Sequence, residues 1–155
     1  MTPTELDQIS YRFFKLFAQY EYALKAMGYG RAGRLKAAEV DWDRFANEIG
    51  IALIRSQDHA VVEARTYLLD HPPKRQVWIN NSVDWAVVPS VDRSAQSLFG
   101  HLRRVRNNLY HGGKFNGRWI DPDRSEELIT RSLALLQHLV RDNQDLREAI
   151  HGNAG

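Results

Sequence analysis

Apolar side chains recur at the three- and four-residue spacing of an α-helix along most of this chain. A proline pair at 72–73 and a glycine pair at 112–113 interrupt that spacing, and both residue types end helices. The spacing predicts helices over about residues 4–27, 40–55, 58–70, 92–111 and 122–149. Because the connections are short, we expect an all-α fold: an antiparallel bundle of about five helices in a single domain over residues 1–155.

Two of these helices carry capping signals at their starts. Thr4 with Asp7 resembles a capping pair for the first helix. Asp121 followed by Pro122 suits the N-cap and first turn of the last helix.

The segment over residues 74–91 loses the helical period. Two runs rich in valine and tryptophan flank Asn80-Asn81-Ser82, which predicts either a short hairpin or an irregular packed loop between the third and fourth helices. We expect Trp78 and Trp85 to fill the core beneath this segment rather than to stack on bases.

Residues 28–33 match the dinucleotide-binding pattern G-x-G-x-x-G. That fingerprint requires a preceding β-strand, whereas a long amphipathic helix is predicted here. Helix capping and a flexible basic loop explain these glycines better.

The composition restricts the function classes. The chain has no cysteine, so it has no disulfide and no thiolate metal site, and its histidines form no recognisable ligand motif. The formal charge of +2 is too small for a broad nucleic-acid footprint, so any such site must be local. The first residues lack a signal peptide and no run is long enough to span a membrane, so we expect a cytoplasmic protein without membrane association.

The fourth predicted helix ends with Arg106-Asn107-Asn108-Leu109-Tyr110-His111, directly before the glycine pair. This run places a guanidinium, an amide and an imidazole on about one and a half helical turns. Imidazole can move protons near neutral pH, and guanidinium can hold a phosphoryl group as its negative charge grows. The set suits cleavage of an RNA phosphodiester without a metal ion or other cofactor. Arg103, Arg104, Tyr110 and Lys114 surround it as predicted RNA-binding residues.

The same run resembles the Arg-x4-6-His motif of the HEPN superfamily, small helical proteins that are often RNases of toxin and defence systems. Asn107 follows the arginine, where these proteins favour a polar residue, and the motif closes the penultimate predicted helix, its usual place in the family. Arg65/His71 and Arg131/His138 share the spacing without these features. The likeness is strongest to small stand-alone prokaryotic members.

This resemblance implies a metal-independent endoribonuclease of the toxin or defence type, with Arg106, Asn107 and His111 as catalytic residues. It also implies a homodimer with a composite site, and an antitoxin or regulatory protein as a partner. In relatives that are controlled by adenylylation, the modified tyrosine lies two residues after the histidine. That position is Gly113 here, so the resemblance does not extend to this form of control.

The fourth predicted helix separates into two faces. Leu98, Leu102, Val105 and Leu109 form the expected core stripe, and Gly100, Arg103, Arg104, Asn107 and His111 lie nearly opposite, with Arg106 at the border. Glycine inside a helix costs about 1 kcal/mol relative to alanine. Two explanations are open for Gly100: close approach of a second subunit, or a helix crossing within one chain.

Three interpretations remain open for the motif. In the first, the motif is the nuclease site described above, and in the second it belongs to a HEPN-like module that binds RNA or a nucleotide without cutting it. In the third, the motif is a coincidence within a helical interaction protein, and His111 merely stabilises the helix dipole.

Overall fold

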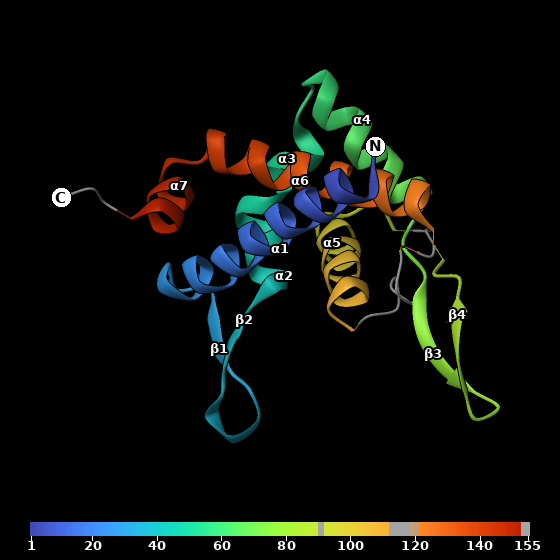
Figure 1. Ribbon diagram of the computed structural model, residues 1–155. Helices are drawn as coiled ribbons and strands as arrows, with labels where there is room; N and C mark the ends of the chain where they lie inside the picture. The colour runs from blue at the N-terminus through green and yellow to red at the C-terminus, as the bar shows by residue number, and fades with distance from the viewer. Residues whose placement is uncertain (90–91, 112–118, 120, 153–155) are drawn as a thin grey trace.

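The computed structural model describes residues 1–89, 92–111, 119 and 121–152, and Figure 1 shows how their elements are arranged. Most of the chain is helical, and two short antiparallel strand pairs project from the helical part (Figure 1). The elements are α1 (Pro3–Ala26), β1 (Gly30–Ala32), the 3-10 turn η1 (Arg34–Lys36), β2 (Ala38–Val40), α2 (Trp42–Phe45), the π-helical turn η2 (Ala46–Gly50), α3 (Ile51–Arg55), α4 (His59–Asp70), β3 (Arg75–Ile79), β4 (Ser82–Ala86), α5 (Ala95–Tyr110), α6 (Pro122–Asp142) and α7 (Gln144–His151).

The N-cap of the first helix lies two residues earlier than predicted, at Thr2. The Thr2 hydroxyl accepts from the Glu5 amide at 3.2 Å, and the Glu5 carboxylate accepts from the Thr2 amide at 2.6 Å, which completes a capping box. The predicted pair of Thr4 and Asp7 is therefore wrong. Pro3 explains the difference, because proline favours the first helical position and so leaves Thr2 as the cap.

The chain is mostly helical, as expected, but it also contains two hairpins, over residues 30–40 and 75–86, of which only the first departs from the prediction. Gly30 pairs with Val40 in the first, and Arg75 pairs with Ala86 in the second. The second is the predicted hairpin alternative, turning at Asn80 and Asn81, whose positive φ angles of 51° and 61° suit a tight two-residue turn.

The position of Trp78 differs from the prediction of a core residue. Its side chain is 68% exposed, and Trp85 on the paired strand is half-buried. The G-x-G-x-x-G stretch belongs to the first hairpin, and α1 precedes it, so the rejected dinucleotide fingerprint lacks the strand it needs.

The last predicted helix is divided into α6 and α7. The predicted start is confirmed, since the Asp121 carboxylate accepts from the Arg124 amide and Pro122 occupies the first turn. Asn143 then adopts an extended conformation, and its side chain accepts from the Leu146 amide at 2.9 Å, so it caps a new helix. Apolar spacing continues across this break, which explains why the sequence predicted one helix.

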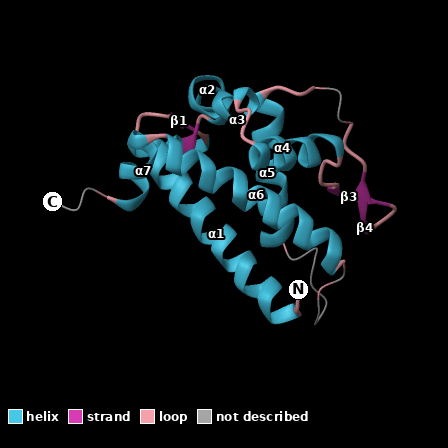
Figure 2. Cartoon of the chain, turned by 90° about the horizontal axis from the view of Figure 1, so that it is seen from above, coloured by secondary structure: helices cyan, strands magenta, loops and turns pink. Residues whose placement is uncertain are grey.

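The core lies where α1, α4, α5 and α6 face one another, with the short helices α2 and α3 completing it (Figure 2). Phe13, Phe17, Tyr20 and Leu24 line the buried side of α1. The Tyr20 hydroxyl donates to the Leu136 carbonyl oxygen in α6 at 2.5 Å, which satisfies the one polar group of this fully buried side chain.

No helix in the described ranges combines the length and apolar character needed to cross a membrane.

Candidate functional site

Helix α5 presents the predicted buried stripe and carries the motif at its C-terminal end. The Ser94 hydroxyl caps the first turn by accepting from the Ser97 amide at 3.1 Å. Leu98, Leu102 and Val105 are buried as expected, which leaves Arg103 and Asn107 exposed. The end of α5 therefore points away from the core, on the side of the molecule toward which both hairpins project (Figure 1).

Arg106 is held by three aromatic rings and one amide. Its guanidinium carbon lies 5.2 Å from the centre of the Tyr110 ring, 5.8 Å from that of Phe17 and 5.9 Å from that of Phe14. One terminal nitrogen donates to the Asn107 Oδ1 at 2.9 Å. Within residues 1–89, 92–111, 119 and 121–152 the Arg106 guanidinium has no other hydrogen-bond acceptor, so its remaining N–H groups can donate to a ligand.

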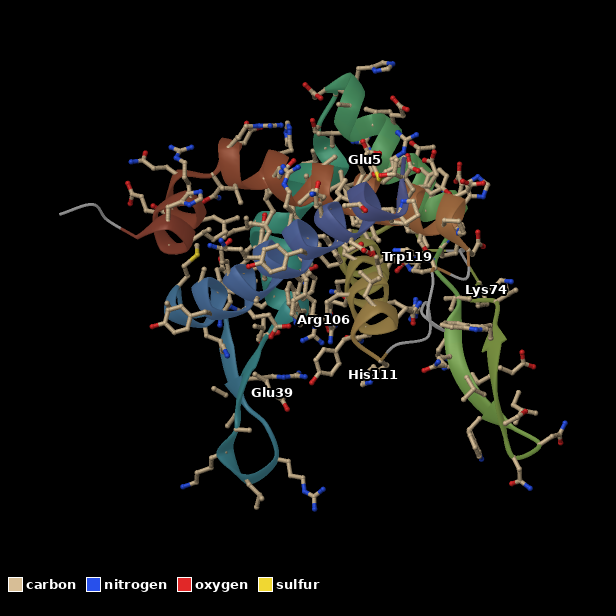
Figure 3. All side chains as sticks on the ribbon, in the orientation of Figure 1. Glu5, Glu39, Lys74, Arg106, His111 and Trp119 are labelled. Atoms are coloured by element: carbon tan, nitrogen blue, oxygen red, sulfur yellow. The ribbon has the colours of Figure 1, made fainter. Side chains whose placement is uncertain are left out.

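His111 follows directly after α5 and is exposed. Its backbone N–H donates to the Asn107 carbonyl oxygen at 2.9 Å, which makes it the C-cap residue. Its imidazole packs edge-on against the Tyr110 ring, with the ring centres 5.2 Å apart. Tyr110 thus contacts both the Arg106 guanidinium and the His111 imidazole, and Figure 3 shows these two labelled residues at the same end of α5.

A groove of about 310 Å³ adjoins Arg106 on the side of the first hairpin. Arg103, Arg106 and Asn107 line it from α5, and Arg31 and Glu39, paired at 3.5 Å, line it from β1 and β2. Two of the three predicted catalytic residues, Arg106 and Asn107, therefore face the β1–β2 hairpin, which was not predicted from the sequence.

Arg103 lies on the wall of this groove. Its guanidinium carbon lies 5.5 Å from the centre of the Trp42 ring. Burial lowers the pKa of Arg103, and the carboxylates of Asp43 and Glu21 oppose that shift. An arginine stays charged despite such a shift, so Arg103 supplies a second cation beside Arg106.

Arg104 lies on a different side of α5. A terminal nitrogen of Arg104 lies 3.4 Å from the Nδ1 of buried His101. Burial, then the charges of Arg75 and Arg103, lower the pKa of Arg104. The structure therefore does not bring this predicted RNA-binding residue to the groove that holds Arg106.

Histidine 101 is expected to make the fold sensitive to acid. Burial, and secondarily the Arg104 charge, lower the pKa of His101, so the folded protein binds a proton there less readily than the unfolded chain does. The contribution of His101 to the free energy of unfolding is therefore fully present above about pH 6.5 and is lost as the pH falls below that value. Urea unfolding at about pH 7.5 and about pH 5 measures the difference, which should shrink in His101→Leu. The exposed His59→Gln is the control, and an unchanged difference in His101→Leu would contradict this assignment.

Several predicted residues lie outside the described part of the chain or in the core. Lys114 and the glycine pair at 112–113 are outside the described residues. Trp119, five residues after Lys114, is in the core: it is 8% exposed, and its indole N–H donates to the Asp7 Oδ1 at 2.8 Å. It joins the core to the start of α1 and does not face the groove.

The space around Gly100 tests one of its two explanations. A Cβ atom built at this position meets no atom within 4 Å, apart from the neighbouring backbone of its own helix. A helix crossing within one chain therefore does not explain this glycine in the described structure. The explanation that a second subunit approaches there remains a prediction.

The sequence pattern did not identify Phe14 as a residue of this site. Phe14 stacks on Tyr110 with ring centres 6.2 Å apart and an angle of 2° between the planes, and it is 38% exposed. Phe14 follows Phe13 directly, so it lies outside the buried stripe of α1. An aromatic residue outside a buried stripe is the sequence feature from which its role could have been predicted.

Among the described residues, no three His, Asp or Glu side chains gather as metal ligands. The chain matches no known family model, no curated protein and no solved structure. The functional inference therefore rests on the geometry of the site and on the sequence motif.

Proposed function

We propose that this protein is a metal-independent endoribonuclease of the toxin or defence type, with Arg106, Asn107 and His111 as its catalytic residues. The observation that carries the proposal is that Tyr110 contacts both the Arg106 guanidinium and the exposed His111 imidazole. A phosphate clamp and a proton-transfer group thus share one surface. The antiparallel-bundle arrangement and the HEPN resemblance belong to the same proposal.

Each residue has a chemical role in this proposal. His111 takes the proton from the attacking 2′-hydroxyl or gives one to the 5′-leaving oxygen. Arg106 stabilises the negative charge that grows on the phosphoryl oxygens. The Asn107 Oδ1 already accepts from Arg106, so its amide N–H groups are left to donate to the phosphoryl group.

Cleavage of an RNA oligonucleotide in EDTA tests this function. We expect the wild-type protein to cut and His111→Ala to lose the activity while it keeps its thermal melting temperature. His59→Ala is the matched control, because His59 is 96% exposed and lies on α4, away from α5. RNA binding without cleavage by the wild-type protein would favour the alternative of a non-cleaving RNA-binding module.

The proton transfers favour a dimer. The reaction needs both an acid and a base, yet His101, the other histidine of α5, is buried. A two-fold partner would bring a second His111 to a composite site, and the open space at Gly100 on the same helix allows a close approach.

Gly100→Ala is expected to stabilise the folded chain but to weaken the association of two chains. In a monomer the new methyl group meets open space, so the helix should gain about 0.5–1 kcal/mol. If two α5 helices cross at Gly100, the same methyl group holds them apart and weakens dimerisation. Light scattering across a dilution series measures the association. A wild-type mass of 17.9 kDa at micromolar concentration would contradict the dimer.

A further inference from the structure

A second groove lies on the other side of α1 from the Arg106 site. It has a volume of about 580 Å³, and its lining comes from α1, α6 and α7. Its cationic residues are Arg12, Lys15 and Arg141, and the polar side chains of His151, Gln19 and Gln137 lie beside them. No carboxylate is among the described residues that line it. By contrast, the groove beside Arg106 includes Glu21 and Glu39.

The cations of this groove are not neutralised within the described structure. None of the ion pairs among residues 1–89, 92–111, 119 and 121–152 uses the side chain of Arg12, Lys15 or Arg141. The three side chains are exposed, so they can reach a bound anion. A cationic channel of this kind is complementary to a row of phosphates.

An exposed aromatic row lies on α1 between the two grooves. Tyr11, Phe14 and Tyr22 lie on one stripe of α1 and are 66%, 38% and 73% exposed. Phe14 stacks on Tyr110 beside the Arg106 site, and Lys15 follows it directly on the wall of the second groove. The row thus runs along α1 between the side that contacts the end of α5 and the side that lines the second groove.

We infer that this surface binds single-stranded RNA, with bases on the aromatic row and flanking phosphates in the groove of Arg12, Lys15 and Arg141. The inference rests on the proposed function and defines the substrate class of that site. Aromatic rings beside a positively charged groove are the combination by which proteins hold single strands, because every base has a face that can stack. A duplex keeps its bases paired and cannot use the row.

Binding of a 2′-O-methyl oligouridylate of about 16 nucleotides tests the inference, because this probe has bases and phosphates but no attacking hydroxyl. Arg12→Gln with Lys15→Gln should weaken binding roughly 10- to 30-fold at about 0.1 M salt. The slope of log affinity against log salt should fall by about 1.4, since each single-strand phosphate contact contributes about 0.7. The matched control is Arg34→Gln with Arg55→Gln, which removes the same charge from exposed residues of η1 and α3.

The aromatic row has its own test. Tyr22→Ala should weaken binding about fivefold or more, whereas Tyr22→Phe should bind like the wild-type protein, because phenylalanine keeps the stacking face. Equal losses in the groove and control pairs, or equal binding of a duplex of the same length, would overturn the inference. So would binding of anionic lipid vesicles, lost in the groove pair, without oligonucleotide binding.

These binding experiments distinguish a failure of the groove inference from a failure of the proposed nuclease function. If the groove pair leaves oligouridylate binding intact while His111→Ala still abolishes cleavage, the groove inference fails and the nuclease proposal stands. If the probe binds through the groove but no RNA is cut, the groove inference stands and the nuclease proposal fails.

Discussion

One 2′-deoxynucleotide at the scissile position is expected to reduce cleavage of an RNA oligonucleotide below detection, whereas EDTA should leave the rate unchanged. In the proposed reaction the 2′-oxygen forms a bond to the neighbouring phosphorus, and the bond from phosphorus to the 5′-oxygen breaks. One imidazole takes the 2′ proton and another gives a proton to the leaving oxygen. Without the 2′-hydroxyl there is no nucleophile, and the side chains at the site cannot replace it.

The products identify this chemistry independently of the rate. The upstream fragment should carry a 2′,3′-cyclic phosphate and the downstream fragment a 5′-hydroxyl, which mass spectrometry distinguishes from the ends of a hydrolytic metal nuclease. A deoxy substitution two nucleotides away is the control, and it should be cut normally. Equal cutting of DNA, or activity that appears only with added Mg²⁺ or Mn²⁺, would exclude the mechanism.

The sequence predicted the elements that bury one stripe of side chains. Leu98, Leu102 and Val105 recur at helical spacing because all three contact the core, and this pattern predicted the buried side of α5 correctly. Because Arg106, Asn107 and His111 lie within one and a half turns of that helix, their proximity follows from local geometry alone. Neighbours from distant segments have no such local signal.

The two hairpins show why the remaining structure was harder to predict. Strand β1 is exposed at all three residues, and Trp78 on β3 faces solvent, so neither hairpin has the alternation of buried and exposed residues that marks a strand packed on a core. The sequence pattern therefore gave no basis for predicting the Arg31–Glu39 ion pair in the Arg106 groove.

The break between α6 and α7 has a similar origin. Asn143 interrupts the backbone, but Leu139 and Leu146, seven residues apart, are both buried and so keep helical spacing across it. Apolar periodicity reports which side of the chain is buried and does not report a change of helix direction. The capping potential of asparagine was the available signal.

Arg106→Lys is expected to be nearly as damaging to cleavage as Arg106→Ala. The guanidinium is planar, donates to Asn107 at 2.9 Å and lies against the rings of Tyr110 and Phe17, so its remaining N–H groups point in fixed directions. A lysine keeps the charge but cannot bind Asn107 and two phosphoryl oxygens in one plane. Loss of one oriented contact in the transition state should cost about 2.7–4 kcal/mol, or about 10²- to 10³-fold in rate.

Arg103→Lys is the matched control for this prediction. Arg103 lies one turn earlier on α5, lines the same groove and contacts the Trp42 ring, so its replacement tests the loss of a guanidinium that only attracts RNA. Either cation supplies that attraction, and the effect should be small. The assay is single-turnover cleavage with a thermal melt of each variant, because Arg106 packs on Phe17 of the core and its loss could unfold the end of α5. A folded Arg106→Lys variant that keeps more than about a third of the wild-type rate, a loss under about 0.7 kcal/mol, would show that Arg106 acts as a surface cation and not as a transition-state clamp.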